Sequence, residues 1–467
     1  MIDQHEKLRE VAWNELFRWL VLLRAVRIAL LARVMVLGAL GLIATTLGWW
    51  CIVAVFSAST DPVIGEWRSV VGDWLWNASP EFSIVTPARS AQELFAAAAD
   101  GLAEAPVTLW LYLTRPFVDL FRGELTAVGF VCLLLCGVWE LLVWGLFGGA
   151  ITRIAALKFT RDEAPDLFAA LRHASGKLLS YSMPPLLALA GAAIFGIQLA
   201  ILGWIMQLSF LALVAGLLWP FVLLLGLMMA ILLIGALVGW PLMFATVSVE
   251  GTDAFDALGS SYAYTYQRPL RLLWYVLLAV ILAAVSMFIV KLFAASAISL
   301  GNWSISWGLD EPTYRAIVAP RGQTEKTSDA TGVPPLALAS PADGPTSESP
   351  STDGPPTDAD TNVATPAELS GMASVAATAI AFWKSLLGAL AAGYQAGFLW
   401  VAAVGVYLLL RKDIDGAEMD EVYVEDEQDF GLPPLADDTA TGVPEVNADA
   451  ESRAGDTGTD QPPGAAS

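Results

Sequence analysis

Residues 178–249 contain no aspartate, glutamate, lysine or arginine, and this run of 72 residues constrains the fold more than any other feature. A bilayer core is about 30 Å thick, and about 20 apolar residues in a helix cross it. Soluble domains carry about 25% charged residues, whereas this chain carries 15%. The run therefore predicts two or three membrane-spanning helices.

Four shorter apolar runs predict further spans. Residues 34–60, 272–290 and 385–410 carry no charge, and residues 125–152 carry only Glu140. Each run is long enough for one span. The expected spans lie at about residues 34–57, 126–151, 184–206, 213–247, 272–294 and 378–411.

The basic residues predict the orientation of these spans. Six lie in residues 1–33, five in residues 151–183, and two each beside the fifth and sixth spans, namely Arg268, Arg271, Arg411 and Lys412. Cytoplasmic loops carry such an excess. Both termini are therefore expected in the cytoplasm of a bacterial inner membrane, so the 72-residue run holds an even number of spans, which is two.

Together these patterns predict an all-α integral membrane protein with six transmembrane helices. Residues 34–302 would form the membrane domain of five spans, with an outer loop at residues 58–125. Residues 1–33 mix arginine with tryptophan and leucine at helical spacing. This pattern favours an amphipathic helix on the inner membrane surface, and the alternative is an extended start to the first span.

Two segments are acidic and rich in proline, threonine and glycine. Residues 303–377 hold ten acids and three bases, and residues 413–467 hold 16 acids and one base. Such segments bury little and repel themselves. We expect a disordered outer loop at 303–377 and a disordered cytoplasmic tail at 412–467. The acidic tail argues against nucleic acid and against anionic lipid as its partner.

Two cytoplasmic connectors share an acid, then Phe-x-Ala-Leu, then a proline that opens the next span. The motif covers residues 168–171 before Pro184, and residues 255–258 before Pro269. Each connector suits a short elbow helix on the membrane face. Their repetition indicates a duplicated hairpin, although the motif is short and coincidence is the alternative.

The second elbow also resembles the loop with which importer permeases bind their ATPase. In that family an acid-Ala-Ala-x-x-x-Gly segment forms the docking helix, and this chain has Asp253, Ala254 and Gly259 at matching positions. Phe255 replaces the second alanine, and the family's downstream Ile-x-Leu-Pro is missing. The resemblance marks Asp253, Phe255 and Gly259 as candidate docking residues.

Glu140 is the one acid in the middle of a predicted span. It lies 13 residues before Arg153, and Gln198 lies 14 residues after Pro184. At 1.5 Å per residue both reach about 20 Å from the inner surface. We expect a protonated Glu140 hydrogen-bonded to Gln198 between adjacent helices, as structural glue. The alternative is a proton or cation relay.

Small side chains and thiols in the apolar runs are expected to pack. Glycines four residues apart allow close approach of helices, and they occur at Gly145/Gly149, Gly235/Gly239 and Gly393/Gly397. Cys51, Cys132 and Cys136 also lie in apolar runs, where packed thiols are expected. The sequence predicts no metal site and no cofactor.

An acidic strip follows the last span. Its candidate partner-docking residues are Asp413, Asp415, Glu418, Asp420, Glu421 and Tyr423. A calcium loop would need an acid at Arg411 and a glutamate at Val422, so that interpretation fails. A basic cytoplasmic protein is the expected partner of this strip, and a solvated tail is the alternative.

Three stretches carry a family resemblance: "WNELFRWLVLLRAVRIALLARVMVLGALGLIATTLGWW", "TVSVEGTDAFDALGSSYAYTYQRPL" and "FLWVAAVGVYLLLRKDIDGAEMDEVYVEDE". They resemble an uncharacterised family of multi-pass membrane proteins from planctomycete-type bacteria. The resemblance covers the spans and skips the acidic segments. It implies a membrane location and topology, and no activity.

The sequence contains no phosphate-binding loop, dinucleotide fingerprint or zinc spacing. We therefore expect a non-catalytic inner-membrane scaffold or envelope component, in contact with the lipid bilayer and with a cytoplasmic protein at its elbows or tail. The alternative is a transporter or permease-like subunit that uses Glu140 and Gln198. The oligomeric state stays open.

Overall fold

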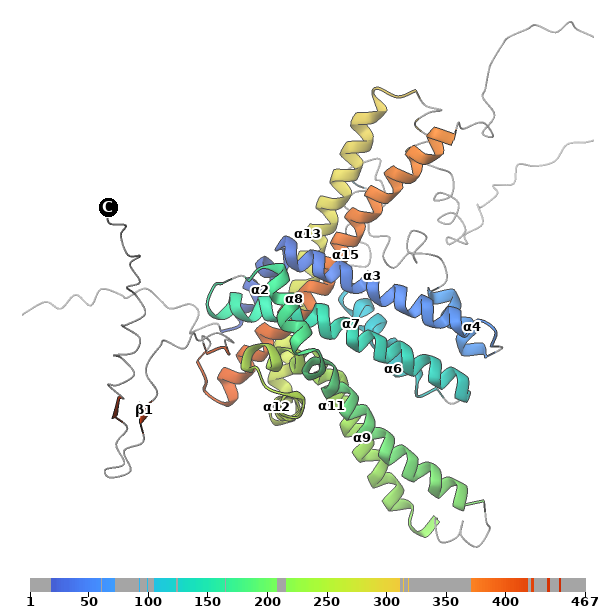
Figure 1. The fold of residues 1–467 in the computed structure, drawn as a ribbon, viewed down its shortest axis with the longest axis vertical. Coiled ribbons are helices and arrows are strands. Elements are labelled where there is room, and N and C mark those ends of the chain that lie inside the picture. Colours follow the sequence, from blue (N-terminus) through green and yellow to red (C-terminus); the bar gives the residue numbers. More distant parts are fainter. Residues whose placement is uncertain are drawn as a thin grey trace, which may run out of the picture. The chain divides into compact units, whose positions relative to one another are not determined.

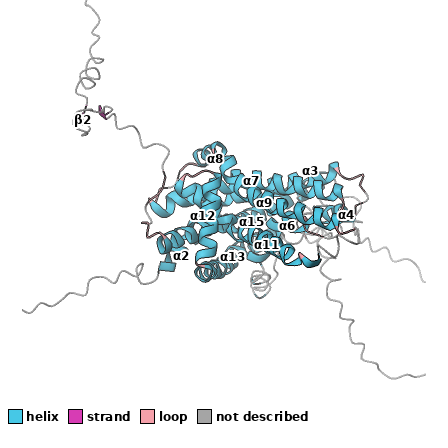
Figure 2. Cartoon of the chain, turned by 90° about the horizontal axis from the view of Figure 1, so that it is seen from below, coloured by secondary structure: helices cyan, strands magenta, loops and turns pink. Residues whose placement is uncertain are grey.

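A computed structural model describes residues 18–59, 61–71, 105–122, 125–163, 165–207, 216–310, 371–418 and 421–423, with isolated positions elsewhere. The described chain consists of helices joined by short connections (Figure 2). Six helices in these ranges are long and apolar enough to cross a membrane. The predicted helical membrane protein with six spans is therefore confirmed at this level.

The six long helices are α3 (Ala32–Val55), α7 (Ala127–Thr160), α9 (Leu178–Ile205), α11 (Trp219–Glu250), α13 (Pro269–Ser306) and α15 (Gly371–Ile414). Shorter helices are η1 (Arg18–Leu20), α2 (Val21–Ala29), α4 (Pro62–Val71), α6 (Ala105–Asp119), α8 (Leu167–Gly176) and α12 (Ala254–Gln267). Several long helices extend well past the expected spans: α7 continues to Thr160, α13 continues to Ser306 and α15 begins at Gly371.

Local sequence signals set several helix ends. The Thr126 side chain caps α7 by accepting a hydrogen bond from the Gly129 amide at 3.1 Å. Gly251 ends α11 in the left-handed conformation, with a φ of 67° that a glycine adopts without strain. Asp253 then caps α12, and Pro269 opens α13 in the first turn.

The last span, α15, lies at the centre of the fold. It packs against α3, α13, α11, α2 and α7, and residues 391–410 are almost completely buried. Residues 150–157 of α7 and 242–249 of α11 are similarly buried around it. Apolar residues on every side of these segments are typical of a helix enclosed by other helices.

The outer parts of the helices are much more exposed. Within the most apolar 18-residue stretch of each helix, 50% of the stretch is buried in α3 and in α7. The buried share is only 11% in α9, α11, α13 and α15. Helices α9 and α11 pair as a hairpin (Figure 1). Large side chains on this hairpin, such as Ile197, Trp204 and Leu227, are exposed. Apolar surface of this extent suits contact with lipid.

The crossing of α3 and α15 depends on glycine. A β-carbon at Gly38 would collide with the carbonyl oxygen of Gly393, and one at Gly393 would collide with the backbone of α3. Gly397 lies against Val34 in the same way. The two backbones therefore touch directly, as the small-residue pattern predicts.

The other two glycine pairs also lie at internal contacts. Gly145 and Gly149 face Ser182 and Tyr181 of α9. Gly235 and Gly239 face Tyr262 and Ser261 of α12. Internal packing of all three pairs is therefore confirmed.

A short hydroxyl network joins three helices beside this core. The Ser248 hydroxyl of α11 donates to Thr152 Oγ1 of α7 at 2.6 Å and lies 2.9 Å from the Tyr181 hydroxyl of α9. Arg153 donates to the Ser248 carbonyl oxygen at 3.0 Å. Because buried polar groups must be paired, this network specifies how α7, α9 and α11 meet.

Helices lie at both predicted elbow positions, as α8 and α12; their location on a membrane face stays a prediction. Residues 1–17 of the predicted N-terminal helix lie outside the described residues, as do residues 311–370 of the predicted disordered loop apart from isolated positions. The two ends of that predicted loop are helical instead, because α13 continues to Ser306 and α15 begins at Gly371. Residues Val422–Ser467 form a second unit. In this unit the two-residue strands β1 (Leu435–Ala436) and β2 (Glu445–Val446) pair antiparallel.

Candidate functional site

Aromatic side chains fill the interior where α7, α11 and α15 meet. The ring centroid of Trp400 lies 5.6 Å from that of Trp144, 5.8 Å from that of Trp240 and 4.6 Å from that of Phe244. Contacts of this kind add about 0.5–1.5 kcal/mol each beyond the area they bury. We call these four residues, with Trp110 and Phe117 of α6, the tryptophan core.

Helix α6 reaches this core from the segment that the sequence predicts as an outer loop. Trp110 and Phe117 lie 5.9 and 6.0 Å from Trp240 between ring centroids. Leu113 and Thr114 of the same helix are buried. Part of the predicted outer loop therefore forms a helix that packs against the long helices through Trp110 and Phe117.

Glu140 lies on the face of α7 that borders the tryptophan core. Trp144 follows it by one turn, and Gly137 precedes it by one turn. A β-carbon at Gly137 would lie 2.8 Å from the Phe117 ring. The Glu140 carboxyl is 0% exposed, and neither oxygen has a hydrogen-bond partner among the described residues.

The chemistry of this buried carboxyl follows from its surroundings. An unpaired charge in such a site costs several kcal/mol, so the site accommodates the neutral acid. A neutral carboxyl both donates and accepts a hydrogen bond. The indole N–H groups of Trp144, Trp240 and Trp400 have no hydrogen-bond acceptor in the described structure either.

The predicted hydrogen bond between Glu140 and Gln198 is not formed, which corrects the sequence-based pairing. The Ser182 hydroxyl of α9 donates to the Leu141 carbonyl oxygen of α7 at 3.0 Å, so Ser182 lies at the depth of Glu140. Gln198 is exposed and lies 16 residues further along α9, about 24 Å along its axis. The depth counted from Pro184 was wrong because α9 begins before this proline, at Leu178, and its first turns contact the middle of α7.

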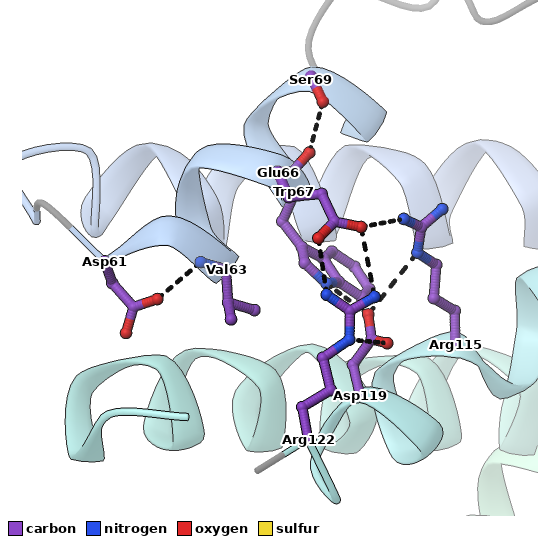
Figure 3. Close-up of polar contacts among 8 residues, drawn as sticks. All are labelled: Asp61, Val63, Glu66, Trp67, Ser69, Arg115, Asp119 and Arg122. Atoms are coloured by element: carbon purple, nitrogen blue, oxygen red, sulfur yellow. Dashed lines mark hydrogen bonds and ion pairs between the residues drawn. The ribbon is translucent and has the colours of Figure 1, made fainter. Parts of the chain in front are cut away.

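A second polar cluster holds α4 to α6, and we call it the outer clasp (Figure 3). The Trp67 indole donates to Asp119 at 2.8 Å. Arg122 pairs with Glu66 at 2.6 Å and with Asp119 at 3.0 Å, and Arg115 pairs with Glu66 at 3.2 Å. Figure 3 shows both arginines directed toward the two acids around the Trp67 ring.

Charge sets the protonation of the outer clasp. The hydrogen bond from Arg122 lowers the pKa of Glu66, and Glu66 in turn raises the pKa of Arg122. The hydroxyl of Thr126 donates to Asp61 and lowers its pKa. Sequence analysis missed this cluster, although Arg115 and Asp119 stand four residues apart on one helix face.

The thiols lie beneath the clasp. Cys132 and Cys136 are buried in one cluster with Trp49 and Trp67, as expected of packed thiols. Cys51, in contrast, is exposed.

Three acids of the acidic strip, which begins in the last turn of α15, have partners within the chain. Asp413 accepts from Arg18 at 2.7 Å and pairs with Arg271 at 3.1 Å, and Asp415 accepts from the Tyr264 hydroxyl. Glu421 pairs with Arg411 at 3.5 Å.

The docking prediction is therefore corrected for Asp413, whose side chain is held by Arg18 and Arg271 and is 4% exposed. Asp415 and Glu421 also have partners within the chain but are exposed, so docking at these two positions stays a prediction. Glu418 and Tyr423 are exposed, and Asp420 lies outside the described residues.

The predicted elbow residues lie on accessible positions of α12. Asp253 caps the helix, accepting from the Asp256 amide at 3.4 Å. Phe255 is 71% exposed. Gly259 follows one turn later on the same face, with open space around its α-carbon.

The chain was compared with protein-family models, with curated proteins and with solved structures, and none of these comparisons found a match. The proposals that follow therefore rest on the geometry.

Proposed function

We propose that the protein is a non-catalytic scaffold or envelope component of a bacterial inner membrane, with both termini in the cytoplasm, and that it binds a cytoplasmic protein through α8 and α12. The observation that carries this proposal is the equivalent display of one phenylalanine on each elbow helix.

The two elbows match residue by residue. Asp166 precedes α8 and Asp253 precedes α12 as the N-cap residue. The second helical residue is Phe168 in α8, 80% exposed, and Phe255 in α12, 71% exposed. Ala170 and Ala257, two residues further on, are both buried against the long helices. This equivalence supports a duplicated hairpin.

The exposure of one phenylalanine ring on each elbow helix favours a role of these rings in binding over a role in folding. A phenylalanine gains about 1.5–3 kcal/mol when it is fully buried, and neither ring obtains that gain within the chain. The buried alanine on the opposite face of each helix fixes the elbow to the core, so little conformational freedom is lost when a partner covers the ring. Aromatic residues presented in this way are typical anchors of protein interfaces.

Photo-crosslinking in living cells tests the proposal. Benzoylphenylalanine at position 168 or 255 is expected to give a discrete protein adduct of the same size from both positions. Gln267, exposed at the far end of α12 and about 120° around that helix from Phe255, is the control position and is expected to give none. Lipid adducts alone, or the same adducts from position 267, would refute a protein partner.

The transporter alternative is favoured by one observation, the buried and unpartnered Glu140. A transported proton would have to reach this carboxyl through the tryptophan core, which opposes the alternative. Proteoliposomes carrying a pH-sensitive dye test it directly. Proton flux that is present in the native protein and lost in Glu140→Gln would establish transport. If neither protein shows proton flux, the scaffold proposal is favoured.

A further inference from the structure

Near the ends of α13 and α15 the structure forms an open pocket of about 460 Å³. Arg271 lies in the first turn of α13, and Asp413 lies one residue before the end of α15. Helix η1, just before α2, closes one side. The lining residues are Arg18, Trp19, Arg271, Trp274, Tyr275 and Asp413.

The pocket carries more positive than negative charge. Asp413 is the one acid among the lining residues, and its side chain is 4% exposed, whereas those of Arg18 and Arg271 are 50% exposed. Both carboxylate oxygens of Asp413 are engaged, Oδ1 by Arg18 and Oδ2 by Arg271 and by the Tyr275 hydroxyl at 2.9 Å. The acid therefore has little capacity to neutralise a second cation.

The two arginines keep most of their donors available. Each guanidinium has five N–H groups in a planar fork. Arg18 and Arg271 each use one terminal nitrogen on Asp413, and the structure shows no other side-chain partner for them within its described ranges. Asp413 thus holds two half-exposed guanidinium groups close together and leaves most of their N–H donors available. Paired forks of this kind match the oxygens of a phosphate group.

An apolar stripe on α13 adjoins the pocket at Trp274, which lines it. Leu270, Leu273 and Leu277 of α13 are exposed and lie at the spacing of one helix face, with Trp274 among them. Arginine and tryptophan at the end of a span are typical of headgroup depth. A ligand with both a phosphate and an apolar chain fits this combination of surfaces better than a free anion does.

We propose that this pocket binds the phosphate of an anionic phospholipid, with Arg18 and Arg271 as ligands and Asp413 as the positioning residue. The acyl chains lie along the Leu270–Leu277 stripe. Bound lipid then joins the start of α2 to α13 and α15. This assignment is independent of the elbow partner, and it stands if the scaffold proposal fails.

The test uses the full chain in mild detergent. Phosphatidylglycerol, phosphatidylcholine and inorganic phosphate are titrated separately, and binding is measured by native mass spectrometry and by the shift in the thermal midpoint. Phosphatidylglycerol is expected to bind and to raise the midpoint, and the other two to have little effect. An equal shift with inorganic phosphate would overturn the lipid assignment.

Variants separate the pocket from general attraction to anions. Arg271→Gln is expected to weaken binding of phosphatidylglycerol by roughly tenfold or more, because a charge-assisted contact is lost. Arg172→Gln removes the same charge from an exposed site on α8 and is expected to bind normally. Equal affinities of these two variants would refute the site.

Two further variants keep the test decisive if Arg271→Gln does not fold. Arg271→Lys retains the ion pair with Asp413 but lacks the fork, and weaker binding by this folded variant is expected. Asp413→Asn removes the carboxylate that holds both guanidinium groups in place, so it is expected to bind phosphatidylglycerol more weakly although the pocket becomes more positive. Binding as tight as that of the native chain would contradict the positioning role of Asp413.

Discussion

Replacing Glu140 with leucine is expected to stabilise the folded protein. The carboxyl is completely buried on α7, and both of its oxygens lack hydrogen-bond partners in the described structure. A buried polar group without a partner costs about 1–3 kcal/mol. Leucine has a similar volume and no polar atom, so it removes this penalty without opening a large cavity.

The expected gain is about 2 kcal/mol in the free energy of unfolding. Glu140→Gln keeps an unsatisfied polar group of the same size, so its stability is expected to stay within about 1 kcal/mol of the native value. Gln198→Leu changes an exposed residue of α9 and serves as the matched control, with little expected effect.

Reversible unfolding in mixed micelles measures these differences. Tryptophan fluorescence is a suitable signal, because Trp144 lies one turn from Glu140 and Trp400 contacts Trp144. A clear loss of stability in Glu140→Leu would refute the reasoning. It would mean that the carboxyl gains a favourable interaction in the membrane, and the transporter alternative would then gain weight.

Two further predictions concern the helix crossing and the outer clasp. Gly393→Val is expected to destabilise the protein by more than about 2 kcal/mol, because the side chain collides with the backbone of α3. Gly388→Val is the control in the same unfolding assay, because Gly388 lies on the same helix and a β-carbon there would have nothing within 4 Å. Equal losses of stability in the two variants would contradict the close crossing. Glu66 has a lowered pKa in the folded state, so its ion pairs stabilise the clasp above the unfolded pKa and are lost as the pH falls below about 4. This contribution is on the order of 1 kcal/mol for a partly exposed pair, and Glu66→Gln is expected to remove that part of the pH dependence of stability; an unchanged acid profile would argue against it.

The amino-acid sequence by itself determined the helical class and the six segments that are long and apolar enough to cross a membrane. These features follow from the local composition of the chain, because a stretch of about 20 apolar residues is long enough to span a membrane whatever its neighbours are. Short-range signals such as Thr126, Gly251 and Pro269 also mark helix ends without tertiary information. The three glycine pairs identified internal contact faces, although their partners were not predictable.

Only the tertiary structure decided which residues meet. Glu140 and Gln198 share a depth when residues are counted from separate boundaries, but Ser182 is the residue of α9 that lies beside Glu140. The acids after α15 look free in the sequence, yet Asp413 is buried between Arg18 and Arg271. Such pairings depend on the tilt and rotation of each helix about crossings such as that of Gly38 and Gly393, and hydropathy carries no information about either angle.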